Sequence, residues 1–141
     1  MIFRIKKVHP DAVIPSYAHG GDAGFDLRST EDILLERGKP TAIPIGINIE
    51  IPEGHTALIW DRSGLAFNHG IKSLGGVIDT GFRGEVKVCL INLGQEDYEI
   101  KKGERVAQMI IQKYEKVDIE EAKELSDGER GSNGFGSTGK D

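Results

Sequence analysis

The sequence predicts an all-β domain built from short antiparallel strands, with one short helix. Five isoleucines occupy every second position from 43 to 51, and this period of two is typical of a strand with one buried face. Further short apolar runs recur along the chain, and clusters of Gly, Pro, Asn and Asp separate them at turn-like intervals. Many short strands with close turn signals are typical of an antiparallel sandwich, a jelly roll or a barrel.

The individual elements follow from the same signals. Besides the strand at 41–52, we expect strands at 2–8, 25–28, 56–60, 86–92 and 106–113. Pro44 has no N–H to donate, so its strand should lie at an edge or carry a bulge there. The one plausible helix covers 63–68, with Ser63 as its cap. Residues 115–125 fit either a helix or a charged strand and loop.

Length and composition favour one domain with a tail. A chain of 141 residues fits a single domain by size, and we place the folded part at residues 1–126. The remaining residues, 127–141, include five glycines interleaved with Ser, Thr and Asn. Such a segment buries too little surface to order itself, so we expect a mobile tail that closes over a ligand or merely solubilises the chain.

Charge and cysteine content exclude several function classes. The formal net charge is −5, from 18 basic and 23 acidic side chains, without a Lys/Arg run. We therefore expect no nucleic-acid polymer as partner, although local arginines can still bind a small phosphorylated ligand. No apolar run approaches the ~20 residues of a membrane span, and no secretory signal is expected. The single cysteine, Cys89, fits a reducing compartment, so we expect a cytoplasmic protein.

The segment DRSGLA at 61–66 follows an apolar strand and opens the short helix. Backbone N–H groups at such a junction suit phosphate oxygens, and Arg62 and Ser63 would add further donors. The alternative is that Ser63 only caps the helix and that Arg62 is solvated.

The segment GGVIDTGFRGEV at 75–86 indicates two strands around a tight connection. Its four glycines point to the close approach of another group. An exposed strand segment presents alternating N–H and C=O groups, which can pair with the O2, N3–H and O4 edge of uracil. Asp79 lies beside this segment, either as a general base that activates water or as an ordinary turn carboxylate.

Two polar side chains interrupt other strands. Asp26 breaks an apolar pattern, so it is either satisfied by its neighbours or close to a cation. Gln108, on the polar side of its strand, is either a phosphate donor or a surface amide.

The tail segment GFGSTGK at 134–140 has the spacing of a phosphate loop, but Asp141 replaces the required Ser/Thr and the flanking strand and helix are missing. Its glycines still let N–H groups approach an anion. Arg130 offers a planar, permanently charged guanidinium group, and Phe135 offers an aromatic ring on which a base can stack.

Taken in order, these segments resemble the homotrimeric dUTP pyrophosphatases. All five motifs of that family are present, as AGFDLRS, DRSGLAF, GGVIDTGFRGEV, GERVAQMI and RGSNGFGSTG, between residues 23 and 139. The resemblance implies a homotrimer of jelly-roll-like β subunits with active sites between subunits. It also implies cleavage of dUTP to dUMP and pyrophosphate with Mg²⁺, which keeps uracil out of DNA and supplies dUMP for thymidylate synthesis.

The resemblance further implies roles for individual residues. Asp79 would activate the water that attacks the α-phosphorus, and Arg130 would act as an arginine finger. Asp26 would touch the metal through water, with Mg²⁺ held mainly by the substrate phosphates. Besides Asp79 and Arg130, the substrate-binding set would comprise Arg62, Ser63, Gly64 and Gln108 at the phosphates, Ser73, Gly76, Val77, Ile78 and Lys87 around the base, Phe82 under the deoxyribose, and Phe135 and Gly136 in the closing tail.

The chain departs from the family pattern at some positions. Phe82 stands where Tyr is usual, so that hydroxyl is absent although the steric role survives. Asp61 replaces a common Pro and adds a negative charge near the phosphate site. Ser73 occupies a place where some members use an Asn, so main-chain contacts to the base are expected to dominate. Two alternatives to a dUTP pyrophosphatase are a dCTP deaminase relative and a non-catalytic nucleotide-binding or partner-interaction module on the same fold; retention of Asp79, Arg130 and Phe135 argues against the second.

Overall fold

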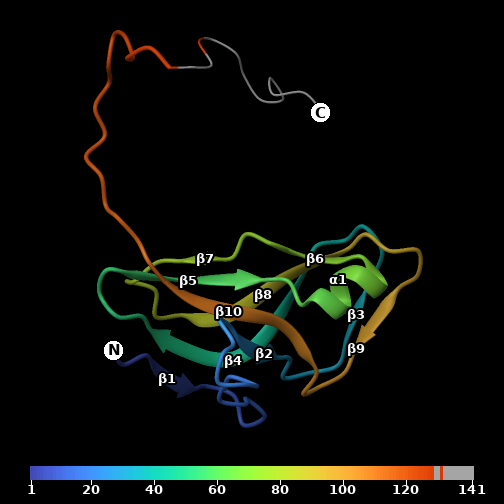
Figure 1. Ribbon diagram of the computed structural model, residues 1–141. Coiled ribbons are helices and arrows are strands. Elements are labelled where there is room, and N and C mark those ends of the chain that lie inside the picture. Colours follow the sequence, from blue (N-terminus) through green and yellow to red (C-terminus); the bar gives the residue numbers. More distant parts are fainter. Residues whose placement is uncertain (129–130, 132–141) are drawn as a thin grey trace.

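The computed structural model describes residues 1–128 and 131 (Figure 1). The described part is mostly β-strand with a single short helix, as the sequence predicts. In chain order the elements are β1 (Arg4–Lys7), β2 (Phe25–Arg28), β3 (Ile33–Leu35), β4 (Thr41–Glu50), β5 (His55–Trp60), α1 (Ser63–His69), β6 (Ile71–Leu74), β7 (Val77–Ile78), β8 (Glu85–Asn92), β9 (Tyr98–Ile100) and β10 (Arg105–Lys113).

The strands form two four-stranded sheets and one small two-stranded sheet, all with antiparallel pairing. The strand orders are β1-β4-β8-β6, β2-β10-β5-β7 and β3-β9. Among the described strands, any two that follow one another in sequence belong to different sheets, so the connections cross between sheets, as in a jelly roll. Inward-facing side chains of both large sheets meet in one hydrophobic core, which includes Leu27, Ile45, Ile59, Val88 and Met109.

β4 confirms the alternating isoleucine pattern and adds a bulge. All five isoleucines at alternate positions from 43 to 51 are at most 2% exposed. The register against β8 shifts between Pro44 and Asn48, and Gly46 has a φ of +71° within this shift. A Cβ on Gly46 would lie 2.7 Å from the Cβ of His9, so only glycine fits. β4 is a central strand, and the bulge, not an edge, accommodates Pro44.

One local expectation was wrong. Ser63 does not cap α1: the N-cap is Arg62, in extended conformation without a side-chain capping bond, and Ser63 is the first helical residue. The Arg62 carbonyl already accepts the first helical hydrogen bond, from Ala66 N at 3.0 Å, which places the cap one residue earlier. Two strands do begin within 75–86, as predicted, but they do not pair with each other. β7 pairs with β5, whereas β8 pairs with β4 and β6.

The chain after β10 takes up no regular secondary structure through residue 128. Residues 115–125 therefore form an exposed loop, and neither a helix nor a strand. Figure 1 shows this segment leaving the sheets, and its side chains are exposed. In the part of the chain that the structure describes, no helix has the length and apolar character needed to cross a membrane.

Candidate functional site

The first group of predicted residues gathers on the outer face of the sheet formed by β2, β10 and β5. Gln108 of β10 lies between Asp26 of β2 and Trp60 of β5 in the pairing register. The neighbours of Asp26 along β2, Phe25 and Leu27, point into the core. Because side chains alternate along a strand, Asp26 and Gln108 share the opposite face, directly below the turn that leads into α1.

Asp26 is held between two arginines. Its Oδ1 accepts a hydrogen bond from Arg62 Nε at 3.1 Å, and its Oδ2 accepts one from Arg105 Nη1 at 3.1 Å. Arg62 also donates to the backbone carbonyl of Arg105 at 3.3 Å. Asp26 is therefore satisfied by its neighbours and close to a cation at the same time, and its carboxylate fixes the orientation of Arg62.

Arg105 is a member of this group that the sequence reasoning missed. It is one charged residue among several in the segment GERVAQMI, and nothing in that local pattern distinguishes it. A register shift between Arg105 and Ala107 against β2 brings its side chain to Asp26. Only the pairing of β10 with β2 reveals that contact.

Ser63 and Gly64 begin α1 on the exposed surface next to Arg62. Gly64 has open space where a Cβ would lie. Gln108 supports this turn from below, because its Nε2 donates to the Asp61 backbone carbonyl at 2.9 Å. Gln108 is thus tied to the turn that carries Arg62, and its Oε1 faces Gly24, where an added Cβ would lie 2.9 Å away.

A second group of predicted residues lines a cavity of about 370 Å³ between β7 and β8. This cavity exists because the two strands belong to different sheets and leave space between them. The predicted residues that line it are Gly76, Val77, Ile78, Asp79, Phe82 and Lys87. Cys89, on β8, also lines it and was not predicted as a site residue.

Backbone hydrogen bonds fix the β7 side of this cavity. The Gly76 carbonyl accepts from Ile59 N at 2.8 Å, and the Ile78 carbonyl accepts from Thr56 Oγ1 at 2.8 Å. Gly76 has a φ of +100°, and a Cβ there would lie 2.8 Å from the Ile59 carbonyl oxygen. The glycine is therefore required by both conformation and contact.

The turn after β7 presents Asp79. Phe82 N donates to the Asp79 backbone carbonyl at 3.0 Å, and Arg83 Nη1 donates to the carbonyls of Thr80 and Phe82 at 2.8 Å. The Asp79 residue is exposed. Within residues 1–128, no hydrogen bond to its carboxylate is formed, so that group is available to an incoming molecule. The Phe82 ring lies against Gly84, 3.1 Å from where a Cβ would be.

Ser73 lies outside the Asp79 cavity and is only 8% exposed. It lines a neighbouring cavity of about 230 Å³ together with Trp60, Gly75, Gly76 and Val77. Its N–H and its hydroxyl both donate to Asp61 Oδ1, each at 2.6 Å. The hydroxyl is therefore engaged within the protein.

Asp61 keeps its negative charge paired. Burial is the largest influence and raises its pKa, but hydrogen bonds from Lys72 and Ser73 outweigh burial and hold the pKa below the ordinary value. Lys72 Nζ lies 2.8 Å from Asp61 Oδ2. The charge that the sequence placed near the phosphate region is thus directed toward β6 and matched by a lysine.

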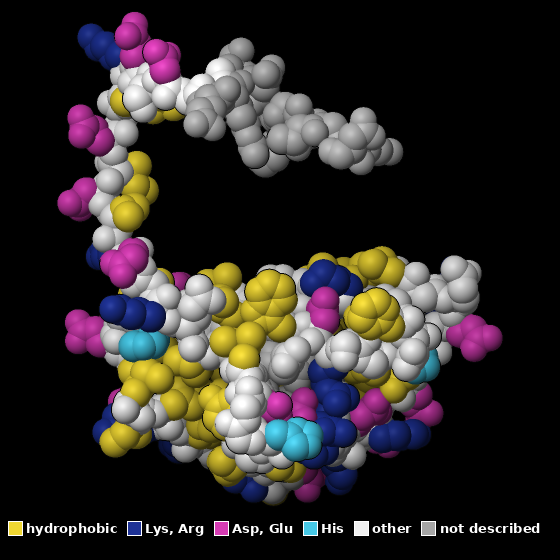
Figure 2. All heavy atoms as spheres, in the orientation of Figure 1, with side chains coloured by type: hydrophobic (Ala, Val, Ile, Leu, Met, Phe, Trp, Pro, Cys, Tyr) yellow, Lys and Arg dark blue, Asp and Glu magenta, His cyan; other side chains and the backbone are white. Residues whose placement is uncertain are grey.

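In the described part of the chain, the first group lies outside the cavity that holds Asp79. Among the described residues, those lining the Asp79 cavity do not include Asp26, Arg62, Ser63, Gly64 or Gln108. The predicted Arg130, Phe135 and Gly136 lie outside the described residues. Figure 2 shows hydrophobic side chains among charged ones along the side of the body that carries β5, β7 and α1; exposed apolar residues of these elements are Trp60 at 51%, Phe67 at 90% and Val77 at 70%.

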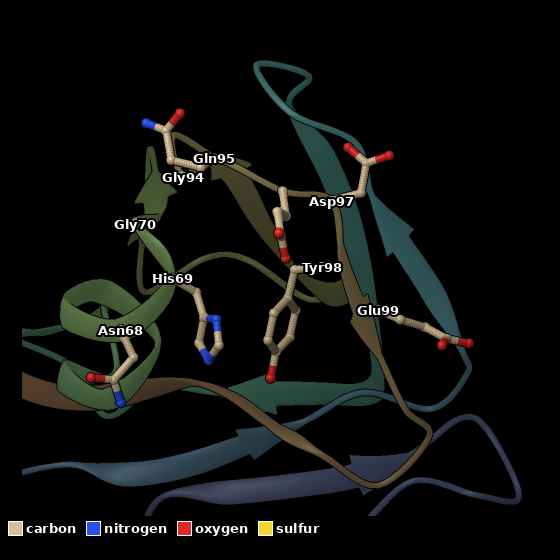
Figure 3. A pocket seen from close by; sticks show the side chains of 9 residues that line it. Asn68, His69, Gly70, Gly94, Gln95, Asp97, Tyr98 and Glu99 are labelled. Carbon is tan, nitrogen blue, oxygen red and sulfur yellow. The ribbon is translucent and has the colours of Figure 1, made fainter.

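Another cavity, of about 410 Å³, lies between the C-terminal end of α1 and the connection from β8 to β9 (Figure 3). The rings of His69 and Tyr98, which line it, lie next to each other, with centroids 4.6 Å apart and planes tilted by 54°. Burial and a hydrogen bond to Glu104 raise the pKa of Tyr98 to about 12. None of the described residues predicted for the site lines this cavity.

Comparison with known proteins agrees with the geometry. The dUTPase family model matches residues 11–139. A deoxyuridine 5'-triphosphate nucleotidohydrolase from Clostridium tetani is 50% identical, over 97% of this chain and 96% of the relative. One from Nautilia profundicola is 49% identical, over 99% of this chain and 100% of the relative.

Solved structures give the same result. The Staphylococcus bacteriophage 80alpha dUTPase with dUPNHPP superposes with a TM-score of 0.91 at 28% identity, covering 98% of each chain. A mutant dUTPase from phage phi11 of S. aureus, described with a structural Mg(II) ion, has the same fold, with a TM-score of 0.83 at 22% identity over 89% of this chain and 99% of that one. With this fold, this ordered set of motif residues and these relatives, the chain belongs to the dUTPase family.

Proposed function

We propose that this protein hydrolyses dUTP to dUMP and pyrophosphate, with Asp79 as the general base. The observation that carries the proposal is the cavity between β7 and β8, which is lined by Asp79, the Gly76–Ile78 segment and Phe82. Asp79 takes a proton from a water molecule, and the water oxygen bonds to the α-phosphorus. The bond between the α-phosphorus and the α,β-bridging oxygen breaks, and pyrophosphate leaves.

The backbone of Gly76–Ile78 binds the uracil ring. β7 is the last strand of its sheet in the described chain, and it pairs with β5 along one edge only. Its other edge therefore has N–H and C=O groups to offer. Uracil presents two carbonyl oxygens and an N–H between them, which matches an alternating backbone edge. Cytosine reverses two of these three positions and would leave buried backbone groups unpaired.

Phe82 packs under the deoxyribose. Phe82 is 37% exposed, and its ring lies beside Gly84, so it offers an apolar surface. A 2′-hydroxyl placed against it would lose its hydration without gaining a hydrogen bond. Lys87, exposed on β8, lines the same cavity and adds a positive charge to it.

Arg62, Ser63, Gly64 and Gln108 hold the phosphates. Arg62 is oriented by Asp26, and its planar guanidinium suits phosphate oxygens. These residues do not line the Asp79 cavity of the same chain. A site that combines both groups is therefore completed by a second copy of the chain, which supports a homotrimer with active sites between subunits. Association would also cover apolar side chains such as Trp60, Phe67 and Val77, each more than half exposed in the single chain.

Mg²⁺ fits this site as an ion held mainly by substrate phosphates. No group of three or more potential ligand side chains occurs in residues 1–128, and Mg²⁺ commonly keeps water molecules and binds one carboxylate plus phosphates. Both oxygens of Asp26 are engaged with arginines, but each retains a lone pair for a metal-bound water. When bound, the ion neutralises charge on the triphosphate. Asp26 would hold a metal-bound water, and Arg62 would bind phosphate oxygens directly.

The family resemblance assigns Arg130 as the arginine finger and Phe135 and Gly136 to the closing tail over uracil. We keep these as proposals for the segment 127–141, and we place the reaction in the cytoplasm because one cysteine fits a reducing compartment.

Incubation with dUTP or dCTP and Mg²⁺, followed by identification of the products, tests the function. We expect dUMP and pyrophosphate from dUTP, and no conversion of dCTP. Formation of dUTP from dCTP would instead identify a deaminase, and binding without turnover would identify a non-catalytic nucleotide-binding module.

A further inference from the structure

Asp61 connects the phosphate-binding group and the base-binding group of one chain, which contribute to sites completed by different copies. It lies between β5 and α1, and its side chain reaches across to β6. One carboxylate oxygen accepts from both Ser73 N and Ser73 Oγ at 2.6 Å, and the other accepts from Lys72 Nζ at 2.8 Å. A carboxylate that receives three donors is held in one orientation.

The hydrogen bond from Ser73 N to Asp61 provides an acceptor at the outer edge of β6. In the described chain β6 is the outermost strand of its sheet, with β8 on one side. The Ser73 N–H that bonds to Asp61 belongs to a residue that is 8% exposed. A buried N–H without an acceptor is unfavourable, so the Asp61 carboxylate takes the place of a neighbouring strand at this point.

A second hydrogen bond joins the end of β5 to the start of the base-binding segment. From Ser73 the chain continues to Gly76, whose carbonyl accepts from Ile59 N at 2.8 Å. Residues 59–61 and 73–76 are therefore joined by two separate links, and the second of them sets the start of β7.

Asp61 also directly precedes the phosphate-binding turn, and its backbone is held by Gln108. Its backbone carbonyl accepts from Gln108 at 2.9 Å, and the next residue is Arg62. Displacement of Asp61 would thus move the turn at Arg62–Gly64 and the approach to β7 together.

We propose that Asp61 is a positioning residue for dUTP hydrolysis. Its side chain holds the phosphate-binding turn at Arg62–Gly64 in place against β6, the strand that leads into the base-binding segment. The proposal rests on the proposed function of those two segments. Asp61 itself touches no substrate: its carboxylate is directed to Ser73 and Lys72. The two hydrogen bonds to Ser73 are the part of the contact that does the positioning, and the Lys72 ion pair, half exposed, adds little.

Two substitutions separate these parts. Asp61→Ala removes every side-chain acceptor, whereas Asp61→Asn keeps a carbonyl oxygen for Ser73 and removes the charge opposite Lys72. We expect Asp61→Ala to lower kcat/KM for dUTP by about 10²-fold, the effect typical of misplacing substrate-binding groups by about 1 Å. We also expect the preference for dUTP over dCTP to fall at least about tenfold as unpaired backbone donors are no longer held in place. Asp61→Asn should retain most of the wild-type kcat/KM for dUTP and most of the preference for dUTP over dCTP.

Amide hydrogen exchange at Ser73 provides a readout that needs no substrate. Exchange should accelerate in Asp61→Ala and stay near the wild-type rate in Asp61→Asn. Asp97→Ala is the matched control, because Asp97 is also a carboxylate that accepts a backbone N–H, from Arg37 at 2.9 Å, but it lies outside the site. This control should change neither the kinetics nor Ser73 exchange.

Wild-type kcat/KM and base preference in a folded Asp61→Ala protein would overturn the proposal. So would equal losses in Asp61→Ala and Asp61→Asn with Ser73 exchange unchanged, since charge alone would then account for the effect. If Asp61→Ala does not fold, Asp61→Asn decides alone. A reduced preference for dUTP over dCTP with a wild-type rate of Ser73 exchange would overturn the proposal. Wild-type values of both quantities would support it. Failure of the general-base assignment would show as an active Asp79→Asn protein and would leave the comparison among Asp61 variants intact.

Discussion

Replacing Gly76 by alanine tests the close contact that sets the start of β7. Gly76 has a φ of +100°, and a Cβ would lie 2.8 Å from the Ile59 carbonyl oxygen and 3.2 Å from the Ile59 Cβ. Gly75 is its matched control, because it has a φ of +69° but no atom within 4 Å of an added Cβ. The pair therefore separates backbone strain from steric contact.

The expected magnitudes follow from these geometries. Gly75→Ala should lose about 1–2 kcal/mol of unfolding free energy through backbone conformation alone. Gly76→Ala incurs strain of about 1–3 kcal/mol and loses the Ile59–Gly76 hydrogen bond, which contributes about 1 kcal/mol. The total is about 2–4 kcal/mol, and at about 2–4 °C per kcal/mol it lowers Tm by about 4–16 °C.

Denaturant unfolding at one fixed protein concentration measures these differences, with concentration held constant because subunit association would shift the transition. Gly81→Ala, which meets no atom within 4 Å and has no positive φ, should stay within about 0.5 kcal/mol of wild type. Gly76→Ala should also lose far more kcat/KM for dUTP than Gly75→Ala. Equal destabilisation by the two alanines would refute the argument that the Ile59 carbonyl excludes a side chain at Gly76.

Three further outcomes are expected. Asp79→Asn should reduce kcat for dUTP by about 10²–10⁴-fold while binding and Tm persist, since only the proton acceptor is removed; a folded variant with full activity would exclude this role. Phe82→Ala should raise kcat/KM for UTP relative to dUTP and leave discrimination against dCTP unchanged; no relative gain for UTP would mean that another group excludes the 2′-hydroxyl. The pKa of Tyr98 is raised from 10.0 to about 12 by burial and by Glu104, so its stabilisation is complete below pH 10 and declines as the pH rises toward 12. Tyr98→Phe should therefore be less stable than wild type in urea unfolding below pH 10, with the difference shrinking above it; a constant difference would contradict the shift.

The sequence alone determined the class of fold and most strand positions. The alternating isoleucines of β4 and the motif segments are local patterns, and burial on one face of a strand requires only that every second residue be apolar. For the same reason 25–28 matches β2 residue for residue, and the other main strands agree within a few residues. The order of the motifs also indicated the family, which the relatives confirm.

Only the tertiary structure decided which of these segments touch. The sequence placed two strands in 75–86 but could not show that they enter different sheets and thereby open the Asp79 cavity. It gave no sign that Arg105 reaches Asp26 or that Asp61 binds Ser73. These contacts join residues that are distant in sequence, and a side chain's partner across a sheet depends on register and crossing connections that local periodicity does not encode.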